Sequence, residues 1–289
     1  MMRGMFAAIS GLKTHQVMLD VTANDIANVN TIGYKSSRTT FKDALSQMQR
    51  GAAGATGTNG GSNAAQVGLG VQLGSIDNLM SGGSLQSTGN ALDVAIQGDG
   101  FFRVGLFSAA DAAASAAQPP ATPTPLDVTN ISYTRAGNFT RNEDGYLVTQ
   151  DGYYVVGRNG AGQEIALQVE DGATGVAIGE DGGVSYIPAA GGARVTAGYI
   201  SLASFPNAAG LERQSNNRWI PSGNSGVETA GLPGTGGTGN LMAGAIEMSN
   251  VDLAQTFTSM ITAQRGFQAN SRVISTSDEM LQDLVNMKR

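Results

Sequence analysis

The side chains that carry most enzyme chemistry are scarce in this sequence. It contains no cysteine, which excludes disulfides, thiolate metal sites and thiol nucleophiles, and it contains a single histidine, His15. One imidazole leaves no second histidine for a metal cage or for a proton relay. We therefore interpret His15 as a solvated or partner-facing side chain, and we expect no enzyme activity, no cofactor and no metal site.

Several segments match all or part of the sequence pattern of a ligand-binding loop, but each lacks other features that such a loop requires. Gly234 to Gly239 matches the dinucleotide fingerprint, yet no predicted strand leads into it and no acidic residue follows at the required distance. Gly33 to Ser36 ends like a phosphate loop but lacks the upstream glycine, and its helix precedes it. The recurring Asp-Gly pairs lack the ligand spacing and closing glutamate of a calcium loop, so we interpret them as turns.

Composition restricts the class of protein further. The 289 residues include 41 glycines and only 14% charged residues, and the formal net charge is −6. A chain this acidic lacks the basic face that nucleic-acid binding needs. No apolar run reaches the length of a membrane span, so we expect the protein not to be embedded in a membrane. Lys13, His15 and Asp20 interrupt the apolar start, so we expect no cleavable leader, although export by another route is compatible with this sequence.

Both ends of the chain carry long amphipathic helix patterns. From Met2 to Ile26 the stripe positions recur at alternating steps of three and four, which predicts a helix over residues 3–30. The same rhythm runs from Leu253 to Val285 and predicts a second, longer helix, preceded by Ser249 and Asp252 as a variant capping box. A stripe sustained over this length suggests a coiled-coil partner or an assembly seam.

The two predicted helices are electrically neutral, because acidic and basic residues balance within 1–32 and again within 250–289. Neutral helices can pack densely against copies of themselves without accumulating repulsion. We therefore predict that the apolar stripes are buried between copies of this chain in a homopolymer. The residues expected to carry this self-assembly are Met5, Ile9, Leu12, Leu19, Ile26, Leu253, Phe257, Ile261, Phe267, Ile274, Leu281 and Val285.

The middle of the chain alternates apolar and polar residues in short runs, as in Leu92 to Ile96, Phe101 to Val104 and Tyr199 to Phe205. Asp-Gly and Asn-Gly pairs separate many of these runs and are typical of hairpin turns. Many short strands at close spacing predict an antiparallel sandwich or open barrel. Together with the helical ends, this pattern predicts an α+β fold.

The same patterns predict the domain organisation. Residues 33–50 are locally basic, and we interpret them as a solvated helix face or as a salt-bridge edge between subunits. The expected units are a terminal helical assembly domain at 1–32 and 250–289, an extended connecting segment at 33–75, and a central β domain at 76–249, which contains an Ala/Pro-rich loop near 109–125 and a Gly-rich linker near 221–240.

Five segments, in order along nearly the whole chain, resemble signatures of the bacterial flagellar rod and hook family. They are ANDIANVNTIGYK at 23–35, LDVAIQGDGFF at 92–102, YTRAGNF at 133–139, MSNVDL at 248–253 and QRGFQANS at 264–271. The residues of these segments that we take as family positions are Asn24, Asn28, Thr31, Gly33, Asp93, Gly98, Gly100, Phe101, Phe102, Gln264, Arg265 and Asn270.

The resemblance implies a structural subunit of a helical tube, located in the flagellar hook or basal body on the periplasmic or extracellular side. The subunit would be exported unfolded, its terminal helices would pair as a coiled coil lining the tube, and its β domain would face outward. The implied partners are further copies of the chain, the rod, the hook cap, the hook–filament junction and the flagellar export apparatus.

Within this family, two interpretations stay open. Ser87-Thr88-Gly89 and the ending from Thr276 to Arg289 favour a compact hook protein, which would join rod to filament as a flexible, torque-transmitting tube. The length is closer to that of a distal rod protein, which is the alternative. An adhesive or ligand-binding module is a hypothesis of a different class, and electron microscopy of the concentrated protein would distinguish its dispersed particles from tubes.

Overall fold

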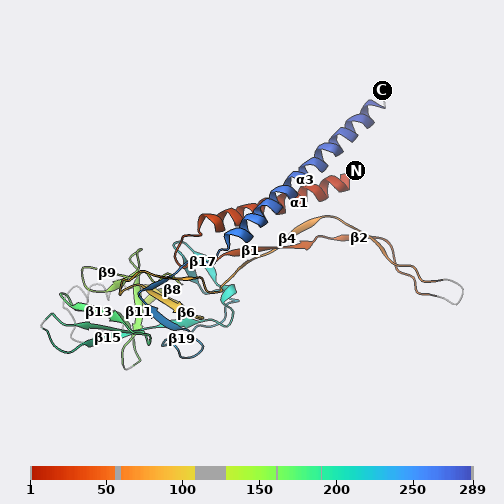
Figure 1. Cartoon of the computed structure of the whole chain (residues 1–289). Coiled ribbons are helices and arrows are strands. Elements are labelled where there is room, and N and C mark those ends of the chain that lie inside the picture. Colours follow the sequence, from red (N-terminus) through yellow and green to blue (C-terminus); the bar gives the residue numbers. More distant parts are fainter. Residues whose placement is uncertain (1, 56–59, 108–127, 161, 190, 288–289) are drawn as a thin grey trace. The chain divides into compact units, whose positions relative to one another are not determined.

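The computed structural model describes residues 2–55, 60–107, 128–160, 162–189 and 191–287. The Ala/Pro-rich loop predicted near 109–125 lies outside these ranges. The chain divides into two compact units, each described by itself below (Figure 1). Unit 1 comprises Met1–Ala27, Ser36–Leu79 and Val251–Arg289, and unit 2 comprises Asn28–Lys35 and Met80–Asn250. The expected α+β class is confirmed, with a helix at each end of the chain and antiparallel strands between them.

Unit 1 contains the two helices α1 (Met2–Ala27) and α3 (Leu253–Asn286), which lie side by side (Figure 1). The first helix ends three residues before the predicted boundary at 30, in a turn. The second begins after Asp252, whose carboxylate accepts hydrogen bonds from the backbone N–H groups of Ala254, at 2.9 Å, and Gln255, at 3.2 Å. Asp252 is therefore the N-cap, and the predicted cap at Ser249 is wrong by three positions.

Two glycines allow the helices of unit 1 to approach each other closely. A Cβ atom on Gly11 would lie 2.7 Å from the side-chain amide of Asn270, and one on Gly266 would lie 2.6 Å from the ring of His15. The His15 ring also meets Phe41 edge-on, with 5.7 Å between the ring centroids. His15 is thus half-buried by contacts within the chain, so it is not simply solvated, and its interpretation as a partner-facing side chain stays a prediction.

Gly266 gives the first testable prediction. Replacing glycine by alanine inside a helix ordinarily stabilises it by about 1 kcal/mol. Gly266→Ala should instead lower the thermal unfolding temperature of the helices, because the new methyl group would overlap the His15 ring. Thermal unfolding followed by far-ultraviolet circular dichroism measures the effect. Gly4→Ala is the control, since no atom lies within 4 Å of a Cβ there; equal stabilisation by both changes would contradict the close approach.

Unit 1 also contains a long two-stranded ribbon. Strand β1 (Ser37–Asp43) pairs antiparallel with β4 (Val71–Asn78), and β2 (Ser46–Arg50) pairs with β3 (Ala65–Gly68). At its base the backbone N–H of Leu79 donates to the carbonyl of Ser36 at 2.8 Å. The predicted connection at 33–75 thus contains paired strands. The helix-face interpretation of 33–50 is wrong, because Thr39-Thr40-Phe41 is a β-branched and aromatic run that favours a strand.

Unit 2 is built on an antiparallel sheet with the strand order β13-β14-β15-β11-β7-β8-β18-β17, to which further short strands attach. The two-stranded pairs β5–β21 and β6–β20 join segments from before and after this sheet in the sequence. The elements are β5 (Leu85–Ser87), β6 (Val94–Gln97), β7 (Phe101–Phe107), β8 (Val128–Thr134), β9 (Thr140–Arg141), β10 (Leu147–Val148), β11 (Tyr154–Arg158), β12 (Glu164–Ala166), β13 (Thr174–Ile178), β14 (Gly183–Ile187), β15 (Val195–Ile200), β16 (Leu202–Ser204), the 3-10 helix η1 (Ala208–Gly210), β17 (Glu212–Gln214), β18 (Arg218–Ile220), β19 (Thr229–Gly231), β20 (Asn240–Ala243) and β21 (Ala245–Glu247).

The core of unit 2 is made by the inward faces of these strands. One cluster gathers around Phe102, Leu147 and Ile200, and a second around Trp219 and Tyr133. The alternating segments read as strands in the sequence supply most of the first cluster. The segment 221–240, predicted as a linker, contains β19, which pairs with β16.

Candidate functional site

One face of α3 is covered within the chain. Ala263 and Ser277 are its buried residues. Phe267 lies four positions after Ala263, Ile274 lies three positions before Ser277, and Leu281 lies four positions after Ser277. These three residues therefore share the covered face, and each is half-buried. The predicted self-assembly residues of α1 are likewise half-buried: Met5, Ile9, Leu12, Leu19 and Ile26.

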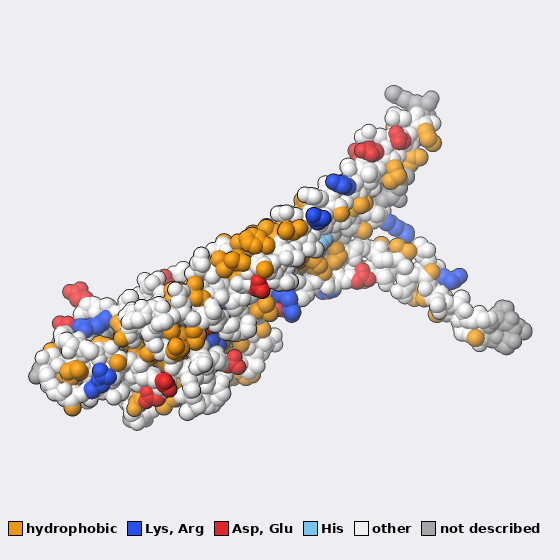
Figure 2. All heavy atoms as spheres, in the orientation of Figure 1, with side chains coloured by type: hydrophobic (Ala, Val, Ile, Leu, Met, Phe, Trp, Pro, Cys, Tyr) orange, Lys and Arg blue, Asp and Glu red, His pale blue; other side chains and the backbone are white. Residues whose placement is uncertain are grey.

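A second face of α3 stays exposed. Leu253, Phe257 and Ile261 recur at steps of four, and their exposed fractions are 42%, 49% and 52%. We call these three residues the proximal flank of α3. They lie about a third of a turn from the covered face, which is the rotation that the six steps from Phe257 to Ala263 produce along the helix. Figure 2 shows apolar side chains gathered in patches along the helices.

The proximal flank is suited to burial against another surface. The first twelve residues of α3, Leu253 to Gln264, contain no charged side chain. The threonine hydroxyls there donate to backbone carbonyls one turn earlier: Thr256 to Asp252 at 2.6 Å, and Thr258 to Ala254 at 2.8 Å. Because these donors are already satisfied, covering the helix would leave none of these threonine hydroxyls without a partner. This flank can therefore be desolvated at little cost.

The far end of α3 exposes further apolar residues. The predicted residue Val285 is 69% exposed. The sequence analysis missed a further set of apolar residues on this helix. They are spaced seven, four and three positions apart, so they lie on one side of the helix, but beside the predicted stripe and not within it. This set comprises Val273, Met280, Leu284 and Met287, all of them exposed.

The ribbon of unit 1 carries a further exposed apolar set that the sequence analysis missed. Leu45 and Met48 are 80% and 61% exposed, and Phe41, Val67, Leu69 and Ile76 are also exposed. α1 covers part of the ribbon, as the contact of His15 with Phe41 shows, but these side chains stay exposed beside it. A two-stranded ribbon is marginally stable alone in water. These residues therefore form a second candidate contact surface.

The family positions within unit 2 are structural. Gly33 has φ +67° and donates its backbone N–H to the carbonyl of Glu247 at 2.8 Å. The Asp93 carboxylate accepts from the hydroxyl of Thr88 at 2.6 Å and from the amide of Asn90 at 3.2 Å. The others are Asn28 and Thr31, joined by a side-chain hydrogen bond; Gly98 and Gly100, with positive φ at the turn between β6 and β7; and Phe101 and Phe102, buried in the two core clusters.

The family positions on the helices of unit 1 differ in exposure. Asn24 on α1 and Gln264 and Arg265 on α3 are exposed, whereas Asn270 is half-buried against Gly11. The structure thus brings together only some of the predicted positions. The close contacts of Gly11 with Asn270 and of Gly266 with His15 were not predicted, because single glycines within a helical pattern do not indicate their neighbours.

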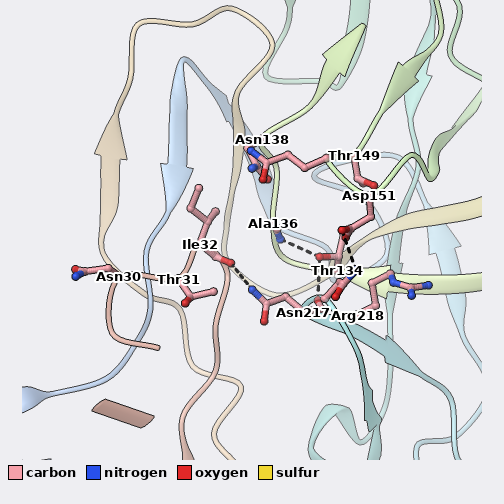
Figure 3. A pocket seen from close by; sticks show the side chains of 12 residues that line it. Asn30, Thr31, Ile32, Thr134, Ala136, Asn138, Thr149, Asp151, Asn217 and Arg218 are labelled. Carbon is pink, nitrogen blue, oxygen red and sulfur yellow. Dashed lines mark hydrogen bonds between the residues drawn. The ribbon is translucent and has the colours of Figure 1, made fainter. Parts of the chain in front are cut away.

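A cavity of about 350 Å³ lies within unit 2 (Figure 3). Amide and hydroxyl groups of its lining residues donate to backbone carbonyls of the lining: Asn217 Nδ2 to Ile32 at 3.0 Å, and the Thr134 hydroxyl to Asn217 at 3.0 Å. Asn216 Nδ2 donates to Asp151 Oδ1 at 2.8 Å. Asp151 is the one carboxylate among the lining residues, so the cavity offers no second carboxylate for acid–base work.

A charged cluster within unit 2 lies around Arg103, which is 2% exposed. Its guanidinium donates to Glu164 Oε1 at 2.5 Å and to Glu228 Oε1 at 3.1 Å. Burial of the Tyr133 phenol, together with its hydrogen bond to Glu228, raises the pKa of Tyr133 far above its usual range. A tyrosine kept protonated in this way serves as a hydrogen-bond donor, so the cluster joins β7 and β8 to neighbouring segments.

Comparison with known proteins adds to this geometry. Residues 5–35 match the family described as "Flagella basal body rod protein", residues 126–186 match "Flagellar hook protein FlgE/F/G D1 domain", and residues 242–287 match "Flagellar basal body rod FlgEFG protein C-terminal". No helix in the described part of the chain is long and apolar enough to cross a bilayer.

Full-length relatives agree with these matches. The flagellar basal-body rod protein FlgG of Bacillus subtilis is 46% identical over 290 residues, covering 100% of both chains. FlgG of Caulobacter vibrioides is 35% identical over 283 residues, covering 97% of each chain. The flagellar hook protein FlgE of Borreliella burgdorferi is 29% identical over 441 aligned positions, covering 100% of both chains. The chain therefore belongs to the flagellar rod and hook family FlgE/F/G, as an axial structural protein of the flagellum that assembles with other flagellar components.

Proposed function

We propose that this chain is a structural subunit of the distal rod of the flagellar basal body. The carrying observation is the full-length similarity to rod proteins named FlgG: 46% identity to the Bacillus subtilis protein, over a length equal to that of the present chain. Similarity to the hook protein is lower and extends over 441 aligned positions, so it requires long gaps in a chain of 289 residues.

The hook interpretation from the sequence is therefore less supported than its alternative. It depended on the short segment Ser87-Thr88-Gly89 and on the last residues of the chain. The end of the chain lies within the match that covers FlgE, FlgF and FlgG together, up to residue 287, so it separates rod from hook poorly. Chain length separates the two interpretations better, because the aligned hook protein requires many positions that this chain of 289 residues does not have.

We propose further that polymerisation uses the terminal helices. In this arrangement α1 and α3 pair as a coiled coil, and the proximal flank of α3 packs against a neighbouring copy. The uncharged stretch Leu253 to Gln264 and its satisfied hydroxyls support this role. Contacts between unlike surfaces that do not close into a ring produce an open helical polymer. The family positions Gln264 and Arg265 lie on the same helix and are exposed.

Electron microscopy of the purified, concentrated protein tests the proposal. A rod subunit is expected to form straight tubes, and a hook subunit would form curved ones. Dispersed particles that bind a ligand would support the alternative of a binding module. Only straight tubes agree with the distal rod.

The ribbon supplies a second prediction. The backbone N–H of Leu69 donates to the carbonyl of Leu45 at 2.9 Å, so residues 46–68 can be replaced by an Asn-Gly turn without disturbing β1 and β4. The shortened chain should remain folded but should need about a tenfold higher concentration to polymerise, because exposed apolar contacts such as Met48 are lost. Light scattering against concentration measures this. An unchanged threshold would show that the ribbon tip makes no contact between copies, and Met48→Ser in the full chain separates loss of an apolar contact from loss of length.

A further inference from the structure

Three charged side chains are buried together within unit 2. Lys35 and Glu247 are 0% exposed and Arg135 is 2% exposed. Glu247 Oε1 accepts a hydrogen bond from Lys35 Nζ at 2.6 Å and from the backbone N–H of Gly83 at 2.8 Å. Glu247 Oε2 accepts from Arg135 Nη1 at 3.1 Å. One carboxylate thus serves two cations and one backbone donor, and we call these three charged residues the Glu247 cluster.

The cluster joins segments that are far apart in the sequence. Lys35 is separated from Glu247 by 212 positions, and its ammonium also donates to the carbonyl of Ser81 at 2.8 Å. Arg135 Nη2 donates to the carbonyl of Gly98 at 2.9 Å. The backbone adds a bond from Gly33 N–H to the carbonyl of Glu247 at 2.8 Å. The first segment of unit 2 is therefore fixed to its last strand, β21, through one residue.

The charges within the cluster are unequal. Two buried cations are hydrogen-bonded to one buried anion, and Asp99 acts on Lys35 as a further but weaker counter-charge. Burial lowers the pKa of Lys35, and the Glu247 carboxylate opposes this shift by stabilising the ammonium. Breaking a buried ion pair by removing one partner is strongly destabilising, because a charge is left without compensation. Losing Glu247 would leave two like charges buried, whereas losing Lys35 would leave Arg135 and Glu247 as a balanced pair.

We propose that the Glu247 cluster is a latch: the cations Lys35 and Arg135 keep unit 2 unfolded until Glu247, on the last strand, is present to compensate them. Before Glu247 arrives, closing the fold would bury Lys35 and Arg135 without the carboxylate that accepts hydrogen bonds from both, so the incomplete unit stays open. A chain synthesised from its N-terminus thus carries the earlier segments of unit 2 in an unfolded form until β21 is available. This inference goes beyond the proposed rod function, because it concerns when a single chain folds and depends on no contact between copies.

Four full-length variants test the charge argument through the thermal unfolding of unit 2. Glu247→Gln keeps the shape and should lower the unfolding temperature by about 10 °C. Lys35→Met should lower it by less than half as much. The double variant Lys35→Met with Glu247→Gln should be more stable than Glu247→Gln alone, because only one cation is then uncompensated. Arg135→Met should resemble Lys35→Met.

The double variant distinguishes the latch from ordinary packing. If Glu247 acted only by shape and hydrogen bonding, the two losses would add, and the double variant would be the least stable of the set. Such additivity would overturn the proposal. Failure of the rod function would leave these unfolding temperatures unchanged, since they are measured on the unassembled chain.

Timing is tested with ribosome-bound chains of increasing length. Unit 2 should resist protease only when Glu247 has left the exit tunnel. Protection that appears at shorter lengths would overturn the latch. In Lys35→Met with Arg135→Met no buried cation opposes closure of the fold, so protection should appear at shorter chain lengths than in the natural sequence.

Discussion

Phe257→Asp is expected to abolish tubes while leaving a folded, soluble chain. Burying a phenylalanine side chain contributes about 1.5–3 kcal/mol, and an aspartate at the same place would have to lose its water. The concentration needed for polymerisation should rise by about 100-fold or more. The single chain should tolerate the change, because Phe257 is 49% exposed and a negative charge near the N-terminus of α3 is favourable to the helix.

Two measurements check this expectation. Electron microscopy reports on tubes, and circular dichroism reports on the fold of the unassembled chain. Val227→Asp is the matched control, because Val227 is 85% exposed but belongs to unit 2 and not to either helix. Tubes from the Phe257 variant at the natural concentration would refute a role for the proximal flank in assembly.

Gly137→Ala is expected to destabilise unit 2 strongly. A Cβ atom there would lie 1.7 Å from the carbonyl oxygen of Val94 and 3.0 Å from the ring of Phe102. The strand cannot move away easily, because Val94 N–H donates to the carbonyl of Gly137 at 2.9 Å. Overpacking of this kind costs about 3 kcal/mol or more, which corresponds to a loss of roughly 10 °C in unfolding temperature.

Thermal unfolding of unit 2 measures the change, and Gly160→Ala is the matched control. Gly160 also lies in unit 2, but no atom is within 4 Å of a Cβ at that position. The control should be close to neutral. A Gly137 variant as stable as the control would mean that the segment after β8 can shift away from Val94.

Sequence alone could predict the elements whose pattern is local. The apolar residues that recur from Leu253 to Val285 predicted α3, because residues three or four positions apart lie on the same face of a helix. The runs at Leu92, Phe101 and Tyr199 predicted strands because their alternation is visible without knowing their partners. The strand β1 was not predicted, because the interpretation of residues 33–50 rested on their basic charge and not on the β-branched and aromatic run Thr39-Thr40-Phe41.

The contacts between distant segments could not be predicted. Nothing near Lys35 in the sequence indicates that Glu247, more than two hundred positions away, is its counter-charge. The stripe of α3 was read as one seam, yet the structure divides it into a covered face and an exposed flank, because α1 reaches only one side of the helix. Gly266 likewise indicates its closeness to His15 only when both helices are in place.

The hydrogen bond between Ser36 and Leu79 has a consequence for how such chains diversify. The segment between these residues leaves and returns at one point. Its base packs against α1, where His15 meets Phe41 and Ser10 Oγ accepts from the backbone N–H of Val71, and the part beyond the Leu45–Leu69 hydrogen bond is a side branch. Adding residues in pairs on the two strands lengthens the branch without changing the pairing near its base. A lineage can therefore elongate, trim or exchange this arm as a cassette, and a reporter domain fused at its tip should leave the remaining architecture undisturbed.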